Sequence, residues 1–253
     1  MMLEQLRKKL GFLKYLDPFY YVDTYLVPKI NPKNTEWINW IIYLVSALFF
    51  AWLIYTILGL LLATPSPMVI VVSGSMEPVL YRGDVVVMQG VSPENINAAQ
   101  TVLALSSLKG VGLNEIAKID ATPPKNLLFI NGEAVPITEK GDTVVYTSTS
   151  LRNLGEPVIH RVVAKVKADD GYYLITKGDN NNVIDQDCGR IIAGTPQYQC
   201  ITLYPIPADE IKGRAVFKIP LIGYVKLLLF DDLPALVFGC NLRSTSPLCS
   251  RPS

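Results

Sequence analysis

The sequence predicts a mainly β domain held to a membrane by one N-terminal transmembrane helix. Two observations carry this prediction. A stretch of 40 residues, Trp37 to Met76, contains no Asp, Glu, Lys or Arg. Beyond Pro67, short runs rich in Val, Ile, Tyr and Thr alternate with Gly, Pro, Asn and Asp, which is typical of strands joined by turns. Only 18% of the 253 residues are charged, against about 25% in soluble domains.

The charge-free stretch predicts the membrane-spanning helix. Ile38 to Leu62 is almost unbroken apolar sequence, and a helix of this length spans about 37 Å, more than the ~30 Å of the hydrocarbon layer. Trp37 and Trp40 lie at one end, where indole rings favour the membrane interface. Such a helix is too long for the core of so small a protein. A cleaved leader would have an apolar core of about 7–15 residues nearer the N-terminus. We therefore expect a transmembrane anchor over 37–63.

The flanking charges predict the orientation. The first cation after the span is Arg82, whereas several precede it: Arg7, Lys8, Lys9, Lys14, Lys29 and Lys33. By the positive-inside rule, residues 1–36 form a cytoplasmic segment, and the β domain over 64–240 lies outside the cell with the tail 241–253. We expect a single-pass protein of the cell membrane.

The cysteines agree with an oxidising side of the membrane. Pairing Cys188 with Cys200 and Cys240 with Cys249 would close short loops. Four cysteines allow three pairings, so this connectivity is one of several.

Seven segments are predicted as strands. They are Met68–Val72, Val85–Met88, Asn126–Ile130, Thr143–Thr147, Val158–Val166, Tyr172–Thr176 and Gly213–Lys218. A short helix is expected around Gly112–Ile119. The apolar segment Ile219–Phe238 contains Pro220, Lys226 and Asp231, which break it too often for a second span. We favour a core-packing segment there over an apolar surface that dips into the membrane.

Composition excludes several functional classes. The net charge is +1, which gives no electrostatic argument for nucleic-acid binding, since that needs clustered cations. His160 is the sole histidine, which excludes zinc sites of the HExxH kind. A calcium loop that starts at Asp179 would need Gly at its sixth position and Glu at its twelfth, where Ile184 and Arg190 stand. We expect no metal and no cofactor.

Three short stretches supply the groups of a serine hydrolase. Ser73-Gly74-Ser75-Met76-Glu77-Pro78 offers a hydroxyl, Val158-Ile159-His160-Arg161-Val162 the imidazole, and Lys177-Gly178-Asp179 to Asp185 two carboxylates. A hydroxyl nucleophile needs a base, and the base needs a third group to fix its tautomer. Each stretch also has an ordinary interpretation: a Ser-Gly-Ser turn, a core histidine and a polar turn.

Chain order narrows the choice of fold. Ser75, His160 and Asp185 follow one another as Ser, His, Asp. The α/β-hydrolases have the order Ser, Asp, His, and chymotrypsin and subtilisin use other orders. The GxSxG elbow is also absent from the sequence. A serine hydrolase with this order belongs to a different fold.

The motifs resemble those of signal peptidase I. Ser-Gly-Ser-Met-Glu-Pro after a span, followed by Arg82-Gly83-Asp84, is similar to that family. His160-Arg161-Val162 and Lys177-Gly178-Asp179-Asn180-Asn181 resemble its archaeal and endoplasmic-reticulum branch, in which histidine replaces the bacterial lysine base. Gly213-Arg214-Ala215 and Pro220-Leu221-Ile222-Gly223 are similar to the segment that closes the family's domain. The resemblance covers the span and most of 68–230.

The resemblance implies a role for each candidate. Ser75 would be the nucleophile, His160 the general base and Asp185 the acid that orients it. Asp179 would be a second important carboxylate, and Ser73 the small polar residue that helps the Ser75 amide bind the oxyanion. The implied fold is a signal-peptidase-like β catalytic domain. The implied activity is removal of N-terminal signal peptides from secretory preproteins, at the membrane and in association with the secretion machinery.

One departure from the family is an inserted stretch of about 91–138. We expect it to form a small β subdomain. Its presence favours a single-chain archaeal enzyme over a eukaryotic subunit.

Two alternatives to the proposed function remain. In the first, Lys177 or Lys140 is the base and His160 is structural. In the second, the chain is a membrane-anchored β domain without catalysis that serves as a binding or assembly subunit.

Overall fold

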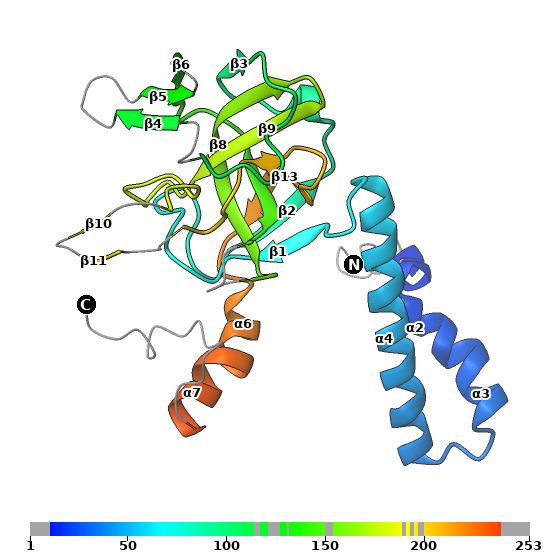
Figure 1. Cartoon of the computed structure of the whole chain (residues 1–253). Coiled ribbons are helices and arrows are strands. Elements are labelled where there is room, and N and C mark those ends of the chain that lie inside the picture. The colour runs from blue at the N-terminus through cyan, green and yellow to red at the C-terminus, as the bar shows by residue number, and fades with distance from the viewer. Residues whose placement is uncertain are drawn as a thin grey trace, which may run out of the picture. The chain divides into compact units, whose positions relative to one another are not determined.

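The computed structural model describes residues 11–113, 117–120, 127–130, 132–149, 154–188, 191–192, 195–196 and 200–238. It divides into two compact units, Met1–Leu61 and Leu62–Ser253. The first holds the long apolar helix and the second holds the β sheets (Figure 1).

The long helix of the first unit is α4, Glu36–Leu61, which covers most of the predicted span. It is long and apolar enough to cross a membrane, and most of its side chains are exposed within the unit. Phe19 packs edge-on against Tyr43 and Phe50 of α4, so the preceding segment lies beside this helix. That segment consists of η1 (Gly11–Leu16), α2 (Pro18–Tyr21), η2 (Val22–Leu26) and α3 (Val27–Ile30).

The second unit is built on one large sheet with the strand order β1-β2-β13-β7-β8-β9-β12, all antiparallel, while β3 joins β8 in parallel. The strands are β1 (Met68–Ile70), β2 (Val85–Gln89), β3 (Gln100–Val102), β7 (Thr143–Thr147), β8 (Pro157–Ala168), β9 (Gly171–Lys177), β12 (Ile206–Pro207) and β13 (Gly213–Ile219). Six of the predicted strands lie in this sheet, and the seventh is β5 of a smaller one. The predicted mainly β architecture is confirmed.

The inserted stretch contributes a separate antiparallel sheet of β4 (Ala117–Asp120), β5 (Leu127–Ile130) and β6 (Glu133–Pro136). Leu128 and Val135 of this sheet are buried in a cluster with Val166 of β8. The predicted helix around Gly112–Ile119 is wrong over 117–119, because these residues pair with β5; residues 114–116 lie outside the described part. The remaining short elements are η3 (Pro93–Asn95), β10 (Ile191–Ile192) and β11 (Thr195–Pro196).

Strand alternation places side chains of β7 on opposite faces of the large sheet. Val144 and Tyr146 point into one buried cluster and Val145 into another, as expected from the two-residue period of a strand. The first cluster contains Leu174 of β9, and the second contains Met76 from the loop after β1. Both faces of the sheet are therefore covered.

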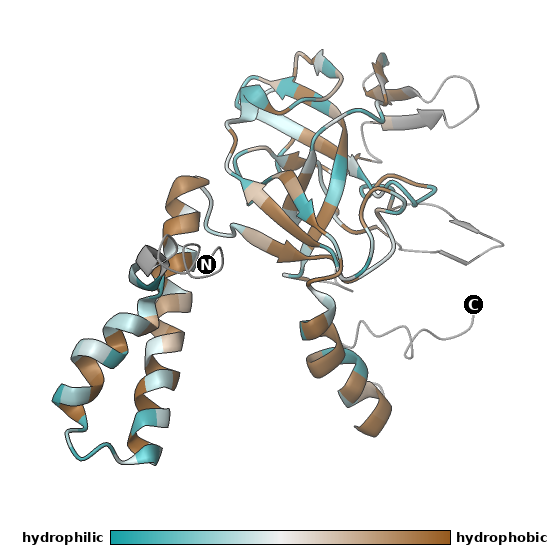
Figure 2. Cartoon of the chain, turned by 180° about the vertical axis from the view of Figure 1, so that it is seen from behind, coloured by the Kyte–Doolittle hydropathy of each residue, from teal (hydrophilic) through white to brown (hydrophobic). Residues whose placement is uncertain are grey.

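The C-terminal segment exposes most of its apolar side chains, which differs from the predicted core packing. It forms α6 (Tyr224–Leu227), η4 (Leu228–Asp232) and α7 (Leu233–Phe238), and the core-packing interpretation of Ile219–Phe238 is wrong for most of it. Val225, Phe230 and Leu236 are 66%, 76% and 71% exposed, and Figure 2 shows that most residues of these helices are hydrophobic. A core-packing segment would bury these side chains in the domain.

The two carboxylates of this segment turn the other way, toward the β domain, whereas Lys226 is exposed. Arg82 lies 3.2 Å from the Asp231 carboxylate and 2.9 Å from that of Asp232. Gly83 has φ +90° and a Cβ there would lie 2.2 Å from the Tyr224 ring, so only glycine fits. The Asp84 carboxylate accepts from the Tyr81 amide at 3.1 Å and from the Leu221 amide, at the start of the C-terminal segment, at 3.4 Å. The Arg-Gly-Asp motif therefore holds the C-terminal segment.

Candidate active site

The candidate nucleophile lies in the loop after β1. Its backbone is held by the turn at 178–181: the Asn180 amide donates to the Ser75 carbonyl at 2.8 Å, and the Asn180 side chain donates to the Gly74 carbonyl at 3.1 Å. A Cβ on Gly178 would lie 2.6 Å from the Ser75 carbonyl oxygen. Glycine is therefore required where the two loops approach. The Lys-Gly-Asp-Asn-Asn motif fixes the position of Ser75.

His160 lies on β8, opposite Val144 of β7. It is 2% exposed. Its Nε2 lies 2.9 Å from Ser75 Oγ, and its Nδ1 lies 2.8 Å from Asp185 Oδ2. Since a carboxylate only accepts, Nδ1 carries the proton and Nε2 of the neutral ring is free to accept from the serine hydroxyl. The structure thus brings together three residues that are far apart in the sequence.

Asp185 is fixed by its own backbone. Its amide donates to the Thr176 carbonyl at 2.8 Å, and its carbonyl accepts from the amides of Ile201 and Thr202 at 2.9 and 3.2 Å. The predicted disulfide between Cys188 and Cys200 is present and ends beside Ile201. The pair Cys240 and Cys249 lies outside the described residues.

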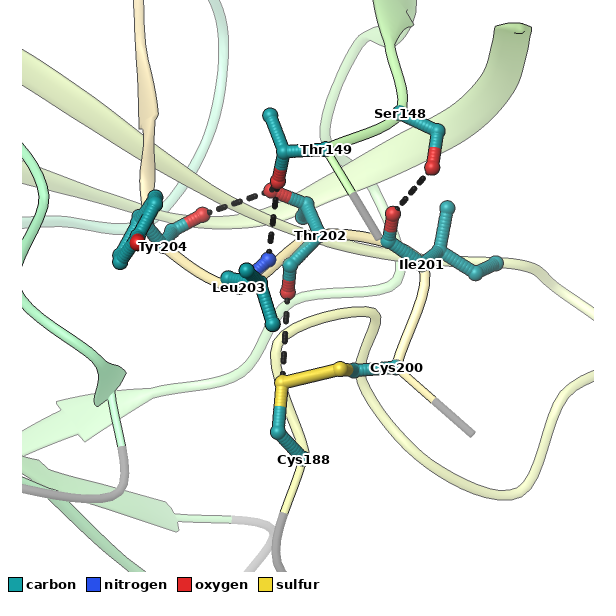
Figure 3. Close-up of a disulfide and its surroundings, with 8 residues drawn as sticks. All are labelled: Ser148, Thr149, Cys188, Cys200, Ile201, Thr202, Leu203 and Tyr204. Carbon is teal, nitrogen blue, oxygen red and sulfur yellow. Dashed lines mark hydrogen bonds between the residues drawn. A yellow bond between two sulfur atoms is a disulfide. The ribbon is translucent and has the colours of Figure 1, made fainter. Parts of the chain in front are cut away.

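The segment after the disulfide is tied to the end of β7 (Figure 3). The Ser148 hydroxyl donates to the Ile201 carbonyl, and the Leu203 amide donates to the Thr149 hydroxyl at 3.0 Å. The disulfide and these bonds hold the strip of backbone that positions Asp185.

Asp179 has a different partner. Its two carboxylate oxygens accept from Nε and NH2 of Arg161, both at 2.7 Å, and NH1 of Arg161 donates to the Gly141 carbonyl. This fork of parallel bonds raises the pKa of the Arg161 guanidinium. The pair anchors the turn that carries Asn180, so Asp179 is linked to the nucleophile through the backbone and not through the imidazole.

The remaining candidates are also placed. Ser73 Oγ lies 3.3 Å from Ser75 Oγ. Within the described residues, neither Lys140 nor Lys177 forms a hydrogen bond with the Ser75 hydroxyl, whose recorded partners are His160 and Ser73. The lysine alternative therefore has no support in the geometry.

A cleft of about 400 Å³ opens beside the serine. It is bordered by β1 and the residues after it on one side and by the start of β8 on the other. Its walls are mainly apolar: Val69, Ile70, Val72, Val145, Pro157, Val158, Ile159 and Ile201, with Ser73, Ser75, Glu156, His160 and Asn181 as the polar members. Among the described residues, no group of three or more His, Cys, Asp or Glu side chains could hold a metal ion.

No family model matches the chain, but curated proteins do. The chain is 30% identical over 175 residues to the signal peptidase complex catalytic subunit SEC11 of Metarhizium robertsii, a match of 68% of this chain and 70% of that protein. It is 30% identical over 206 residues to SEC11 of Pyricularia oryzae, a match of 79% of this chain and 84% of that protein. It is 31% identical over 175 residues to SEC11 of Metarhizium acridum, a match of 68% of this chain and 70% of that protein. This chain belongs to the signal peptidase family. The predicted activity, a protease that removes signal peptides, and the signal-peptidase-like β fold are thereby confirmed.

Three residues of this signal peptidase site had no predicted role. Asn180 and Arg161 stand inside quoted motifs, but a sequence does not show which backbone they reach. Tyr146 donates its hydroxyl proton to Asp185 Oδ2 at 2.8 Å. In the sequence, Tyr146 is indicated only by its place on the inward face of the predicted strand Thr143–Thr147. A buried tyrosine hydroxyl needs a hydrogen-bond partner there.

Proposed function

We propose that this signal peptidase cleaves preproteins with Ser75 as nucleophile, His160 as general base and Asp185 as the group that orients the imidazole. One observation carries the proposal: His160 lies between Ser75 Oγ and Asp185 Oδ2, at 2.9 and 2.8 Å. These are the contacts that nucleophilic catalysis by serine requires.

Each step uses these contacts. Ser75 Oγ bonds to the scissile carbonyl carbon as its proton passes to His160 Nε2. The imidazolium, stabilised by Asp185, then gives that proton to the leaving amine of the mature chain as the C–N bond breaks. Water attacks the acyl-enzyme ester with His160 again as base, which releases the leader and restores Ser75. We assign the Ser73 hydroxyl as a donor to the oxyanion together with the Ser75 amide, and its place 3.3 Å from Ser75 Oγ supports this role.

The cleft supports an extended substrate with small side chains. Among the described strands, β1 is at the edge of the large sheet and pairs with β2 alone, and an edge strand can pair with an extended peptide. The cleft of about 400 Å³ must hold several residues of that peptide between apolar walls. Small residues before the cut, as signal peptides present them, fit this space.

The proposed location is a membrane with the β unit on the side away from the cytoplasm. The cations before α4 favour a cytoplasmic N-terminus, and the Cys188–Cys200 disulfide favours an oxidising compartment for the β unit. The substrate is a preprotein held at the same membrane. We further propose that α6 to α7 lies in lipid, because most of its exposed side chains are apolar, with Lys226 the exposed cation, and its carboxylates face inward.

Cleavage of a preprotein by the purified chain in vesicles tests the mechanism. Ser75→Ala and His160→Ala each lower kcat at least about a thousandfold, and the double variant is no worse than either, because the residues act as one unit. Lys177→Ala and Lys140→Ala keep activity. A His160→Ala enzyme that still cuts at the wild-type rate would overturn the proposed base. Cleavage by the single chain without added subunits is also expected.

A further inference from the structure

A buried phenol lies on the far side of the candidate triad. Tyr146 of β7 is fully buried, and its hydroxyl donates to Asp185 Oδ2 at 2.8 Å. This is the same oxygen that accepts from His160 Nδ1 at 2.8 Å. Register explains the meeting, because Val144 of β7 stands opposite His160 and Tyr146 is two residues further along, on the same face.

The phenol is itself held by neutral donors. The Thr176 hydroxyl donates to Tyr146 Oη at 3.3 Å, and the Gln186 side-chain amide donates to the Thr176 hydroxyl at 3.3 Å. Thr176 and Gln186 are fully buried. The protons of this chain therefore all point toward the Asp185 carboxylate, and cooperative polarisation strengthens the bond nearest the charge.

The groups that face Asp185 come from every element packed around it. β8 contributes His160 and β7 contributes Tyr146, both to Oδ2 of the carboxylate, while Thr176 of β9 accepts from the Asp185 amide and supports Tyr146 through its neutral hydroxyl. Burial and the negative charge of Asp185 raise the pKa of Tyr146 well above 10. The phenol therefore remains a proton donor across the range in which a peptidase works.

We propose that Tyr146 is a positioning residue of the reaction. Its hydroxyl fixes the Asp185 carboxylate and offsets part of the negative charge of that carboxylate. Asp185 can then orient His160 without stabilising the imidazolium form too strongly. The inference rests on the proposed triad. A phenylalanine would fill the same space but would remove the donor to Asp185 Oδ2 and the acceptor of the Thr176 hydroxyl, so packing alone does not account for the phenol. The hydroxyl donates to the same carboxylate oxygen that accepts from the imidazole.

Tyr146→Phe tests the role in the full-length chain with a soluble peptide substrate. A hydrogen bond to a buried charge controls the geometry of the base, so kcat falls roughly ten- to hundredfold while KM stays within about twofold. Without the phenol, the carboxylate is balanced by the imidazolium alone. The acid limb of the kcat/KM profile therefore moves to higher pH, which loss of packing would not cause.

Tyr173→Phe is the matched control. Tyr173 is also buried, and its hydroxyl donates to Asp170 Oδ2 at 2.7 Å, a pair that makes no contact with the triad in the described structure. This variant keeps wild-type kcat and the wild-type pH profile. An unchanged kcat and acid limb in Tyr146→Phe, with His160→Ala inactive, overturns the role of Tyr146 and leaves the triad standing. An active His160→Ala enzyme overturns the triad itself.

Discussion

Two carboxylates six residues apart differ in what they face. Asp185 faces the imidazole of His160 at 2.8 Å and is 2% exposed. Asp179 faces the guanidinium of Arg161 through two bonds of 2.7 Å. The first can act on the proton that His160 carries, whereas the second can act only through the loop that it anchors.

Asp185→Asn and Asp179→Asn should therefore fail in different ways. Asp185→Asn replaces the acceptor that fixes the imidazole tautomer, so kcat falls roughly 10³–10⁴-fold with little change in the unfolding temperature. Asp179→Asn removes the charge from a part-buried ion pair, which costs about 1–3 kcal/mol of stability and lowers kcat about tenfold or less. Peptide kinetics and thermal unfolding of both variants measure this.

The opposite pattern would contradict these assignments. If Asp179→Asn loses as much kcat as Asp185→Asn and unfolds at the wild-type temperature, Asp179 acts on the chemistry directly. Arg161→Lys is a useful companion variant, because lysine keeps the charge but cannot form the two parallel bonds. It should reproduce the Asp179→Asn behaviour.

The types and order of residues along the chain were enough to predict the candidate catalytic residues. They did not predict which other side chains hold those residues in place. Ser75, His160 and Asp185 are polar groups in strand-and-turn contexts, and the resemblance named them together. Asn180 contacts the Ser75 carbonyl, 105 residues away in the sequence. Tyr146 contacts the Asp185 carboxylate, 39 residues away. Such contacts depend on strand order and register, which local patterns do not contain.

At the scale of elements, strands with a clear apolar run were predictable. β2, β7, β8, β9 and β13 each combine β-branched residues with flanking turn residues. β10, β11 and β12 have two residues each, too few for a period to show. Residues 117–119 show no alternation long enough to indicate a strand, yet pairing with β5 makes them one. Tertiary pairing decided that case.

The helices α6 to α7 show a polarity opposite to that of a soluble surface helix. Phe230 and Leu236 are more than two thirds exposed, while Asp231 and Asp232 turn inward to Arg82. In water, exposed apolar groups of this size would cost about 1.5–3 kcal/mol each relative to burial. In a lipid interface the same side chains are buried and the neutralised carboxylates avoid the acyl chains.

Phe230→Asp tests this element. Placing a charge in the lipid-facing surface should lower cleavage of a preprotein in vesicles about tenfold, because the helix leaves the bilayer. Cleavage of a soluble peptide should not change. A phospholipid with a photoreactive acyl chain should label residues 221–238 in the wild type and not in the variant.

Leu154→Asp is the control, since Leu154 is 68% exposed and lies outside the C-terminal segment. It should leave both substrates and the labelling unchanged. Wild-type protein that gains no label over 221–238 would contradict the lipid contact. A cross-link of that segment to a second protein chain in its place would assign the surface to a protein partner.

At the scale of the whole molecule, composition predicted the boundary between the membrane-spanning helix and the β domain. It did not predict the internal structure of either part. A charge-free stretch is a strong signal because few soluble segments lack charge over such a length, and α4 lies within two residues of its predicted limits. The helices that precede α4 and the sheet β4-β5-β6 were not predictable in detail. Both depend on packing: Phe19 against Tyr43, and Leu128 within the cluster beside β8.

Orientation is the prediction that concerns the molecule as a whole. The chain contains no Asn-x-Ser/Thr sequence, so an added one reports sidedness without background. The substitution Asn97→Thr completes such a sequence at Asn95, which is exposed at the end of η3 in the β unit. Translated into microsomes, this variant should gain a glycan, visible as slower migration that an endoglycosidase reverses.

An N-terminal extension that carries the same acceptor sequence is the matched control. It should stay unmodified, because we expect the cations before α4 to keep that end in the cytoplasm. A glycan on the extension and none at Asn95 would invert the topology. It would place Ser75 and the Cys188–Cys200 disulfide on the reducing side, where neither the disulfide nor access to exported preproteins has a physical basis.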